Sequence, residues 1–307
     1  MKERQRIKWL VILFLGVVFL GSSPATIHGQ TNSLPAIEVI DSRGKSLRVQ
    51  ETINDLVAIL PSDVEILYEL GAGDKITGRG EYANYPREVE KIPIVSSEGI
   101  INVEEIIHLD PDLILIGQMA ASEETVNKLE QVGIPVFVSD AQSIEDIYTT
   151  IETLGLLVGE ELAATQLVEK MQATFDEYAS KAEEQIGPSV YFEVSPLEFG
   201  LYTAGEGTFM DELAKVLHAK NIFAHERGWP EISQEQVIQR SPEVIVSTDT
   251  QPDAVKEISQ RKGWEKIPAV ESQRIYQVDT DVFSRPGPRL MEAVQELYDI
   301  LYGPADS

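Results

Sequence analysis

The sequence predicts an α/β protein of two similar lobes that one long helix joins. A segment made of a short helix, a proline and a buried strand occurs twice, at residues 102–116 and 233–247. Between the copies, residues 160–185 contain neither glycine nor proline and carry apolar residues at helical spacing. At 1.5 Å per residue this helix would be roughly 39 Å long. Helices alternating with short buried strands indicate parallel sheets in both lobes.

The repeated segment has clear start and stop signals. Each copy opens on a capping residue, Asn102 or Ser233, and has Glu105 or Gln236 three positions later. This spacing is typical of a capping box. Nine positions after the cap a proline ends the helix, and four or five apolar residues follow as a buried strand. Two such units predict two lobes of the same class.

Each copy also places a glutamate in the first helical turn, at Glu104 and Glu235. The helix dipole favours a carboxylate there by about 0.3–1 kcal/mol, so helix stabilisation is one interpretation. The second interpretation is that each lobe displays one acidic side chain and that a partner with two equivalent subunits recognises the pair.

The first 33 residues predict a leader. Lys2, Arg4, Arg6 and Lys8 come before an apolar run at residues 9–20, and small residues follow. This order is typical of a secretory signal, and the run is short for a membrane span. An uncleaved anchor is the alternative. We expect an N-terminal lobe at residues 34–158, a linking helix at 159–186 and a C-terminal lobe at 187–307.

The composition excludes several classes of function. The net charge is −26, from 25 Lys and Arg against 51 Asp and Glu, so we expect no nucleic-acid partner. The chain has no cysteine, which excludes disulfides, thiolate metal sites and a lipid anchor on cysteine.

Within the first lobe, residues 36–49 predict a hairpin and residues 56–60 a buried strand. Ser62 and Glu65 have the spacing of a capping box, so we expect the next helix to start at Ser62. In the second lobe, a glycine-rich loop at residues 200–207 leads into a helix.

No catalytic motif is present: the sequence lacks a nucleophile elbow, a phosphate loop and a His-Glu-x-x-His pair. His108, His218 and His225 share no motif of the kind that binds zinc. We therefore expect no enzyme activity, no catalytic residue, no resident metal and no cofactor.

Aromatic residues occur in loops of both predicted lobes: Tyr82, Tyr85, Tyr202, Trp229 and Phe283. Loops at strand ends are where α/β sheets form ligand crevices. These side chains predict a cleft for a large, flat and partly apolar ligand, although loop aromatics also cover cores.

From about residue 50 to residue 303 the chain resembles the extracytoplasmic solute-binding proteins of ABC importers for cobalamin, haem or ferric siderophores. The motifs that carry the resemblance lie at residues 81–86, 101–115, 221–223, 229–242 and 285–289.

The resemblance implies two Rossmann-like lobes joined by a single long α-helix, the class III periplasmic binding protein fold. It implies that Glu104 and Glu235 dock into the permease dimer. It also implies that Tyr82, Tyr85, Tyr202 and Trp229 face the ligand, together with the loop from Phe283 to Arg285.

The chain departs from well-known cobalamin binders at two positions that carry tryptophan there, Glu98 and Gly117 here. We keep Glu98 among the ligand-facing positions. Many relatives also carry a lipid on a cysteine at the end of the leader, and here residues 20–23 have no cysteine.

We therefore expect an exported, monomeric substrate-binding subunit, in the periplasm or at the outer face of the membrane. Its partners would be a permease dimer with ATPase subunits. The favoured ligand is a corrinoid such as cobalamin, because no arginine cluster suited to an anionic chelate is evident. Haem, with Tyr82 or Tyr85 on ferric iron, is second, and a hydroxamate siderophore is third. A chelatase-like enzyme and a binder of free zinc or manganese are alternatives from other classes.

Overall fold

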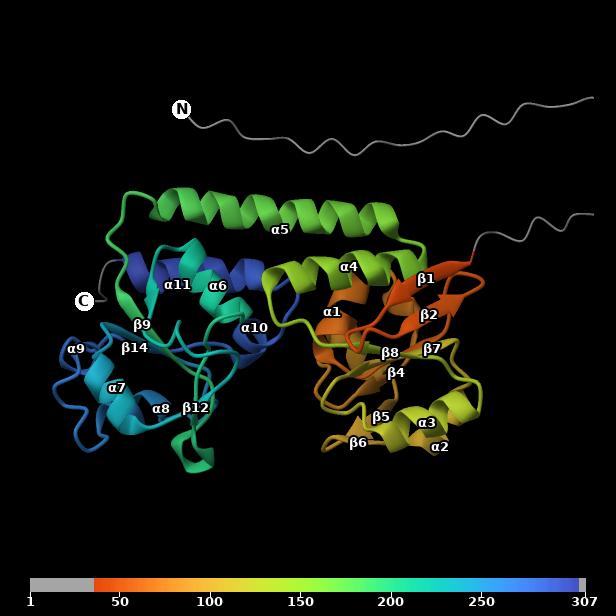
Figure 1. Cartoon of the computed structure of the whole chain (residues 1–307), viewed down its shortest axis with the longest axis horizontal. Helices are drawn as coiled ribbons and strands as arrows, with labels where there is room; N and C mark the ends of the chain where they lie inside the picture. The colour runs from red at the N-terminus through yellow and green to blue at the C-terminus, as the bar shows by residue number, and fades with distance from the viewer. Residues whose placement is uncertain (1–35, 304–307) are drawn as a thin grey trace, which may run out of the picture. The chain divides into compact units, whose positions relative to one another are not determined.

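The computed structural model describes residues 36–303, and the predicted leader lies outside the described residues. Its larger sheet has the strand order β6-β5-β4-β3-β7-β8, parallel except for the pair β5 and β6 (Figure 1). The strands are β3 (Leu56–Ala58), β4 (Ile76–Gly80), β5 (Ile94–Ser97), β6 (Ile100–Ile101), β7 (Leu113–Gly117) and β8 (Val136–Ser139). Successive residues of β3 and β7 point to opposite faces, which explains why these strands are apolar throughout.

The second sheet has the order β11-β9-β13-β14 and is parallel throughout. Its strands are β9 (Ser189–Glu193), β11 (Lys220–Asn221), β13 (Val244–Ser247) and β14 (Ile275–Gln277). Two antiparallel pairs accompany the sheets: the predicted hairpin of β1 (Ile37–Ile40) with β2 (Ser46–Val49), and β10 (Leu201–Tyr202) with β12 (Glu231–Ile232).

Helices cover both faces of each sheet. The α-helices are α1 (Pro61–Glu69), α2 (Val103–Leu109), α3 (Glu123–Gln131), α4 (Ile144–Val158), α5 (Glu161–Ala182), α6 (Phe209–Val216), α7 (Gln234–Arg240), α8 (Ala254–Ser259), α9 (Pro268–Glu271), α10 (Thr280–Ser284) and α11 (Leu290–Tyr302). Short 3₁₀ turns lie at Gly73–Lys75, Arg87–Lys91 and Leu197–Phe199. The α/β class is thus as predicted.

The long helix α5 (Glu161–Ala182) lies between the two sheets in the chain and packs against α4 and α11. Its buried side chains, such as Met171 and Phe175, belong to one core cluster that also contains residues of both sheets. Because one core extends through both sheets, it does not mark where one lobe ends and the next begins. The lobe boundaries given above stay a prediction.

The two repeat copies fold alike. The side chain of Asn102 accepts a hydrogen bond from the Glu105 backbone N–H, and Ser233 forms the complete predicted capping box with Gln236. Each helix ends on a residue in the left-handed region before the proline, Asp110 at φ 48° and Ser241 at φ 47°. The left-handed residue, followed by a proline, ends each helix and turns the chain into β7 or β13.

The start of α1 differs from the prediction. The helix begins one residue earlier than expected, at Pro61, and no side chain caps it. Proline is favoured at this first position because its missing N–H would have no helical partner. Ser62 therefore does not cap the helix, and Asp63 and Glu65 lie inside it as buried residues.

Candidate functional site

A cavity of about 280 Å³ lies at the carboxyl ends of β3, β7 and β8. The chain leaves β3 toward β4 on one side, while β7 lies on the other, so the cavity sits where the strand order changes direction. Ligand crevices of open α/β sheets form at this place because two successive loops diverge there. The loops after all three strands contribute to its wall, through Leu60, Gly117 and Ser139 among others.

Two buried polar side chains line this cavity without a partner. Asp63, from the first turn of α1, is 1% exposed, and its Oδ2 atom has no hydrogen bond. Ser139, the last residue of β8, is 3% exposed, and its Oγ atom is unpaired as well. Burial raises the pKa of Asp63 from its ordinary value of 3.8 to about 7, and the nearby Ser139 hydroxyl opposes this rise.

Residues that follow the first strand of the second sheet form the opposite wall of the cavity. Trp229 and Phe209 line the cavity, and their ring centroids are 5.4 Å apart. The indole Nε1–H of Trp229 donates to Gln142 Oε1 at 2.8 Å, and the Phe209 backbone N–H donates to the Gln142 carbonyl at 2.7 Å. Gln142 therefore joins the two walls across the cavity.

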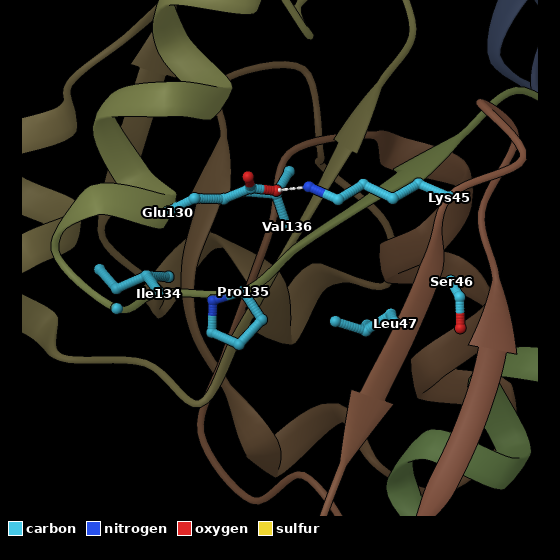
Figure 2. A pocket seen from close by; sticks show the side chains of 8 residues that line it. Lys45, Ser46, Leu47, Glu130, Ile134, Pro135 and Val136 are labelled. Carbon is cyan, nitrogen blue, oxygen red and sulfur yellow. Dashed lines mark hydrogen bonds and ion pairs between the residues drawn. The ribbon is translucent and has the colours of Figure 1, made fainter.

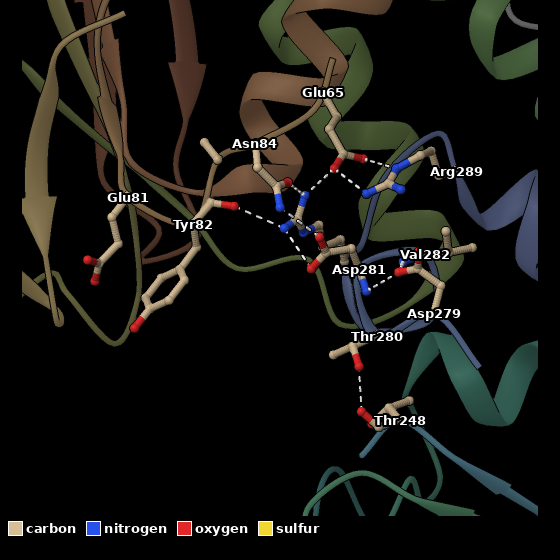
Figure 3. A network of polar contacts seen from close by, with 12 residues as sticks. Glu65, Glu81, Tyr82, Asn84, Thr248, Asp279, Thr280, Asp281, Val282 and Arg289 are labelled. Carbon is tan, nitrogen blue, oxygen red and sulfur yellow. Dashed lines mark hydrogen bonds and ion pairs between the residues drawn. The ribbon is translucent and has the colours of Figure 1, made fainter. Parts of the chain in front are cut away.

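A network of charged groups lies close to this cavity (Figure 3). Glu65 is 2% exposed and accepts hydrogen bonds from Arg285 at 2.7 Å and from Arg289 at 2.7 and 2.9 Å. Arg285 also donates to the Asn84 side chain and to the Tyr82 carbonyl, both at 2.9 Å. We call these residues the Glu65 network, and it ties α1 and the loop after β4 to the loop before α11.

The predicted ligand-facing residues are only partly brought together. Trp229 lines the cavity, whereas Tyr82, Tyr85 and Tyr202 lie elsewhere, 65%, 41% and 37% exposed. In Figure 3 the Tyr82 ring points away from Glu65, while its carbonyl faces the network. Glu98 is exposed, and its backbone N–H donates to the Glu81 carboxylate. These four stay predicted contacts for a ligand larger than the cavity.

Two predicted contacts need correction. The side chain of Phe283 is fully buried in the core, so its ring presents no surface to a ligand. The guanidinium of Arg285 is held by Glu65 and Asp281, each at 2.7 Å, and is 8% exposed. Both residues support the loop, and its neighbours Ser284 and Pro286 line the cavity instead.

The structure explains why a large side chain is missing at position 117. A Cβ atom on Gly117 would lie 2.7 Å from Leu60 Cδ2. Leu60, which also lines the cavity, therefore occupies the space that a tryptophan would need.

Glu104 and Glu235 are both exposed in the first turns of α2 and α7. Within the described unit both helices lie on the side away from α5 (Figure 1). Both side chains are therefore accessible to a partner, as a role in docking requires.

A second pocket lies elsewhere in the described residues. Figure 2 shows this pocket, which lies between the hairpin, the end of α3 and the start of β8, and where Lys45 pairs with Glu130. Among residues 36–303, no group of three or more His, Asp or Glu is arranged to hold a metal ion. Within the same range, no helix combines the length and apolarity of a membrane span.

Sequence reasoning missed Asp63, Ser139 and Gln142. A signal was present: Ser139 ends a buried strand, and Asp63 and Gln142 each follow one by a few residues. Polar residues at such carboxyl ends lie at the crevice of a parallel sheet. The capping-box spacing of Ser62 and Glu65 accounts for this segment by itself and so hides the role of Asp63.

The comparisons with known proteins identify the family of this chain. Residues 56–282 match the family model described as periplasmic binding protein. The chain is 36% identical, over 98% of both chains, to an uncharacterized ABC transporter substrate-binding lipoprotein of Bacillus subtilis (strain 168), YvrC. It is 31% identical to the vitamin B12-binding protein of Yersinia pestis (strain Pestoides F), covering 79% of this chain and 84% of that one.

Solved structures show the same fold. A possible iron-binding protein of Staphylococcus epidermidis ATCC 12228 matches with a TM-score of 0.74 and 34% identity, over 82% of this chain and all of that chain. The vitamin B12-binding protein BtuF of Vibrio cholerae matches with a TM-score of 0.69 and 24% identity, over 81% and 96%. The fold is that of class III periplasmic binding proteins. The chain belongs to the periplasmic binding protein family, and it is a substrate-binding component of an ABC transporter.

Proposed function

We propose that this protein captures a corrinoid such as cobalamin in the cavity between its two sheets and delivers it to a permease. The protein acts by binding and release and carries out no chemistry on the ligand. Because the 280 Å³ cavity is smaller than a corrinoid, it holds one edge of the ligand. The exposed Tyr82, Tyr85 and Tyr202 then contact the remainder.

The observation that carries the proposal is the chemistry of the cavity wall. Trp229 and Phe209 supply aromatic surface for a flat ligand, and none of the described residues that line the cavity is basic. A strongly anionic chelate would have no cation to pair with there and would meet Asp63 instead. A bulky, nearly neutral chelate suits this wall, and the 31% identity to a vitamin B12-binding protein supports the same class.

The partner in this function is an ABC permease dimer with its ATPase subunits. Glu104 and Glu235 each stand at the exposed start of a repeat helix, so the two sheets present one carboxylate each. Two equivalent acidic groups fit two equivalent subunits of a dimer. Exposed charges of this kind steer the encounter and set the register of the complex. The predicted leader at residues 1–33 supports export to the side of the membrane where this docking takes place.

Titration of the purified protein with cyanocobalamin, haemin and a ferric hydroxamate tests the ligand class. Trp229 lines the cavity, so a bound chelate is expected to quench its fluorescence. The proposal expects saturable quenching by cyanocobalamin at the lowest concentration of the three. The Trp229→Phe variant shows whether the quenched signal comes from the cavity. Saturable binding of haemin or the ferric hydroxamate, without binding of cyanocobalamin, contradicts the proposal.

A ferric chelate is the second candidate. It is favoured by the 34% identity to a possible iron-binding protein, which this chain matches over that protein's full length. The same titration decides between the two candidates.

A further inference from the structure

Asp63 and Ser139 are an unusual pair for a folded core. Buried polar groups are nearly always hydrogen-bonded, because an unpaired one costs free energy that folding does not recover. Here two such groups come from adjacent elements, the start of α1 and the end of β8. Each has an unpaired, buried oxygen, and both residues line the same cavity. An unpaired group that lines a cavity is available to a ligand.

The surroundings fix what kind of group would satisfy this pair. The described residues of the cavity wall include Asp63 and Asp140 but no lysine, arginine or histidine. Asp140 already accepts a hydrogen bond from the Gln142 side chain at 2.8 Å. Asp63 therefore has no cation beside it, and the Ser139 hydroxyl offsets only part of the effect of burial, which agrees with its raised pKa.

We propose that Asp63 and Ser139 form a subsite that accepts an uncharged N–H donor of the ligand, as the primary carboxamide groups at the rim of a corrinoid provide. The Asp63 carboxyl accepts the amide N–H, and the Ser139 hydroxyl bonds with the same amide. The subsite rests on the proposed function, since it assigns part of that ligand to named atoms.

The same subsite selects against a carboxylate at this place. A ligand carboxylate has no N–H to donate, and above about pH 7, where Asp63 is ionised, it brings a second negative charge into the buried site. A site discriminates strongly between two ligands when the wrong one leaves a buried polar group of the protein without a hydrogen bond. The subsite therefore separates chelates rimmed by amides from chelates rimmed by acids.

The test measures affinity for cyanocobalamin and for its monocarboxylic acids, in each of which one amide is hydrolysed to an acid. The natural protein is expected to bind one of the acids at least about tenfold more weakly than cyanocobalamin, the loss of one hydrogen bond to a charged group. In Asp63→Leu, which keeps a similar volume without an acceptor, cyanocobalamin is expected to bind about tenfold more weakly, and the difference between amide and acid disappears.

A matched pair of hydroxyl deletions provides the control. Ser139→Ala removes an unpaired hydroxyl and should weaken cyanocobalamin binding. Thr150→Val removes a hydroxyl that also lines the cavity but already donates to the Asp146 carbonyl at 2.8 Å, so binding should not change. Circular dichroism of each variant confirms that it is folded. If Asp63→Leu is not, Asp63→Asn is the second variant: its side-chain amide can donate to an acid, so the preference for cyanocobalamin over its monocarboxylic acids should be lost.

The outcomes separate the subsite from the proposed function. If cyanocobalamin binds equally to the natural protein, Asp63→Leu and Ser139→Ala, the subsite is wrong and the function stands. If haemin binds and cyanocobalamin does not, the function is wrong, and haemin is then compared with its diamide. If the diamide binds more tightly than haemin, and Asp63→Leu abolishes this difference, the subsite is supported. Preference for haemin itself, or no binding of any of these chelates, overturns it.

Discussion

Two carboxyl groups on the first helix, only two residues apart, have opposite surroundings. Glu65 is 2% exposed and is held by the guanidinium groups of Arg285 and Arg289. Asp63 is 1% exposed, and its Oδ2 atom has no partner. The difference separates two roles: the carboxylate with charged partners holds segments together, whereas the carboxyl with an unpaired oxygen lines the cavity and is the one we propose for the ligand.

The first prediction concerns the Glu65 network and has the largest expected effect. Glu65→Gln leaves the guanidinium of Arg289 without its paired carboxylate and that of Arg285 with Asp281 alone, which should lower the free energy of unfolding by about 3 kcal/mol. Urea denaturation followed by circular dichroism measures the change. A loss below about 1 kcal/mol would show that the network is not a stabilising contact.

The second prediction applies the same chemical change to Asp63 and expects the opposite sign. The folded-state pKa of Asp63 is raised to about 7, so ionisation of this carboxyl destabilises the folded protein as the pH rises from about 4 through 7. Asp63→Asn removes that cost and should raise the free energy of unfolding at pH 8 by about 2 kcal/mol.

At pH 4 the natural carboxyl is protonated in the folded state, and the advantage of Asp63→Asn should be nearly absent. Thermal denaturation of both proteins at pH 4 and pH 8 gives this difference. The effect of pH on the other carboxylates cancels in the comparison, because both proteins contain them. A variant that is less stable than the natural protein at pH 8 would show that Asp63 has a stabilising partner.

The third prediction concerns the bridge across the cavity. Trp229→Phe keeps the aromatic contact with Phe209 and removes the hydrogen bond to Gln142. The free energy of unfolding should fall by no more than about 1 kcal/mol, because both groups are near the surface of the cavity and water can replace the bond. Calorimetric scans measure the change. A fall comparable to that of Glu65→Gln would mean that this bridge, and not the Glu65 network, holds the two walls together.

The fourth prediction has the smallest effect on stability. Glu104 and Glu235 are exposed, so replacing both by arginine should lower the free energy of unfolding by less than about 1 kcal/mol in total at physiological salt, which screens the helix dipole. The same double variant should lose ligand transport with a reconstituted permease while binding the ligand normally. The two single variants show how much each glutamate contributes to transport. Unchanged transport by the double variant would contradict the docking role.

The sequence predicted elements whose signals are local. The capping residues Asn102 and Ser233 and the long helix at 161–182 depend on neighbours in the chain, and the structure confirms them. The partners of Glu65 could not be predicted this way, because Arg285 and Arg289 are more than two hundred positions away. Phe283 was misplaced for a related reason: a position shortly after the final strand does not tell a core-facing ring from a ligand-facing one, and the residue lies in α10 with its ring buried.

The most direct test of the account is the pKa of Asp63 itself, measured by carbon NMR of ¹³C-labelled aspartate with Asp63→Asn to assign the signal. The account predicts a pKa near 7 in the free protein, and a fall of at least about one unit when cyanocobalamin binds, because an amide N–H stabilises the ionised carboxyl. A pKa near 4 in the free protein, or no change on saturation with cyanocobalamin, would contradict it.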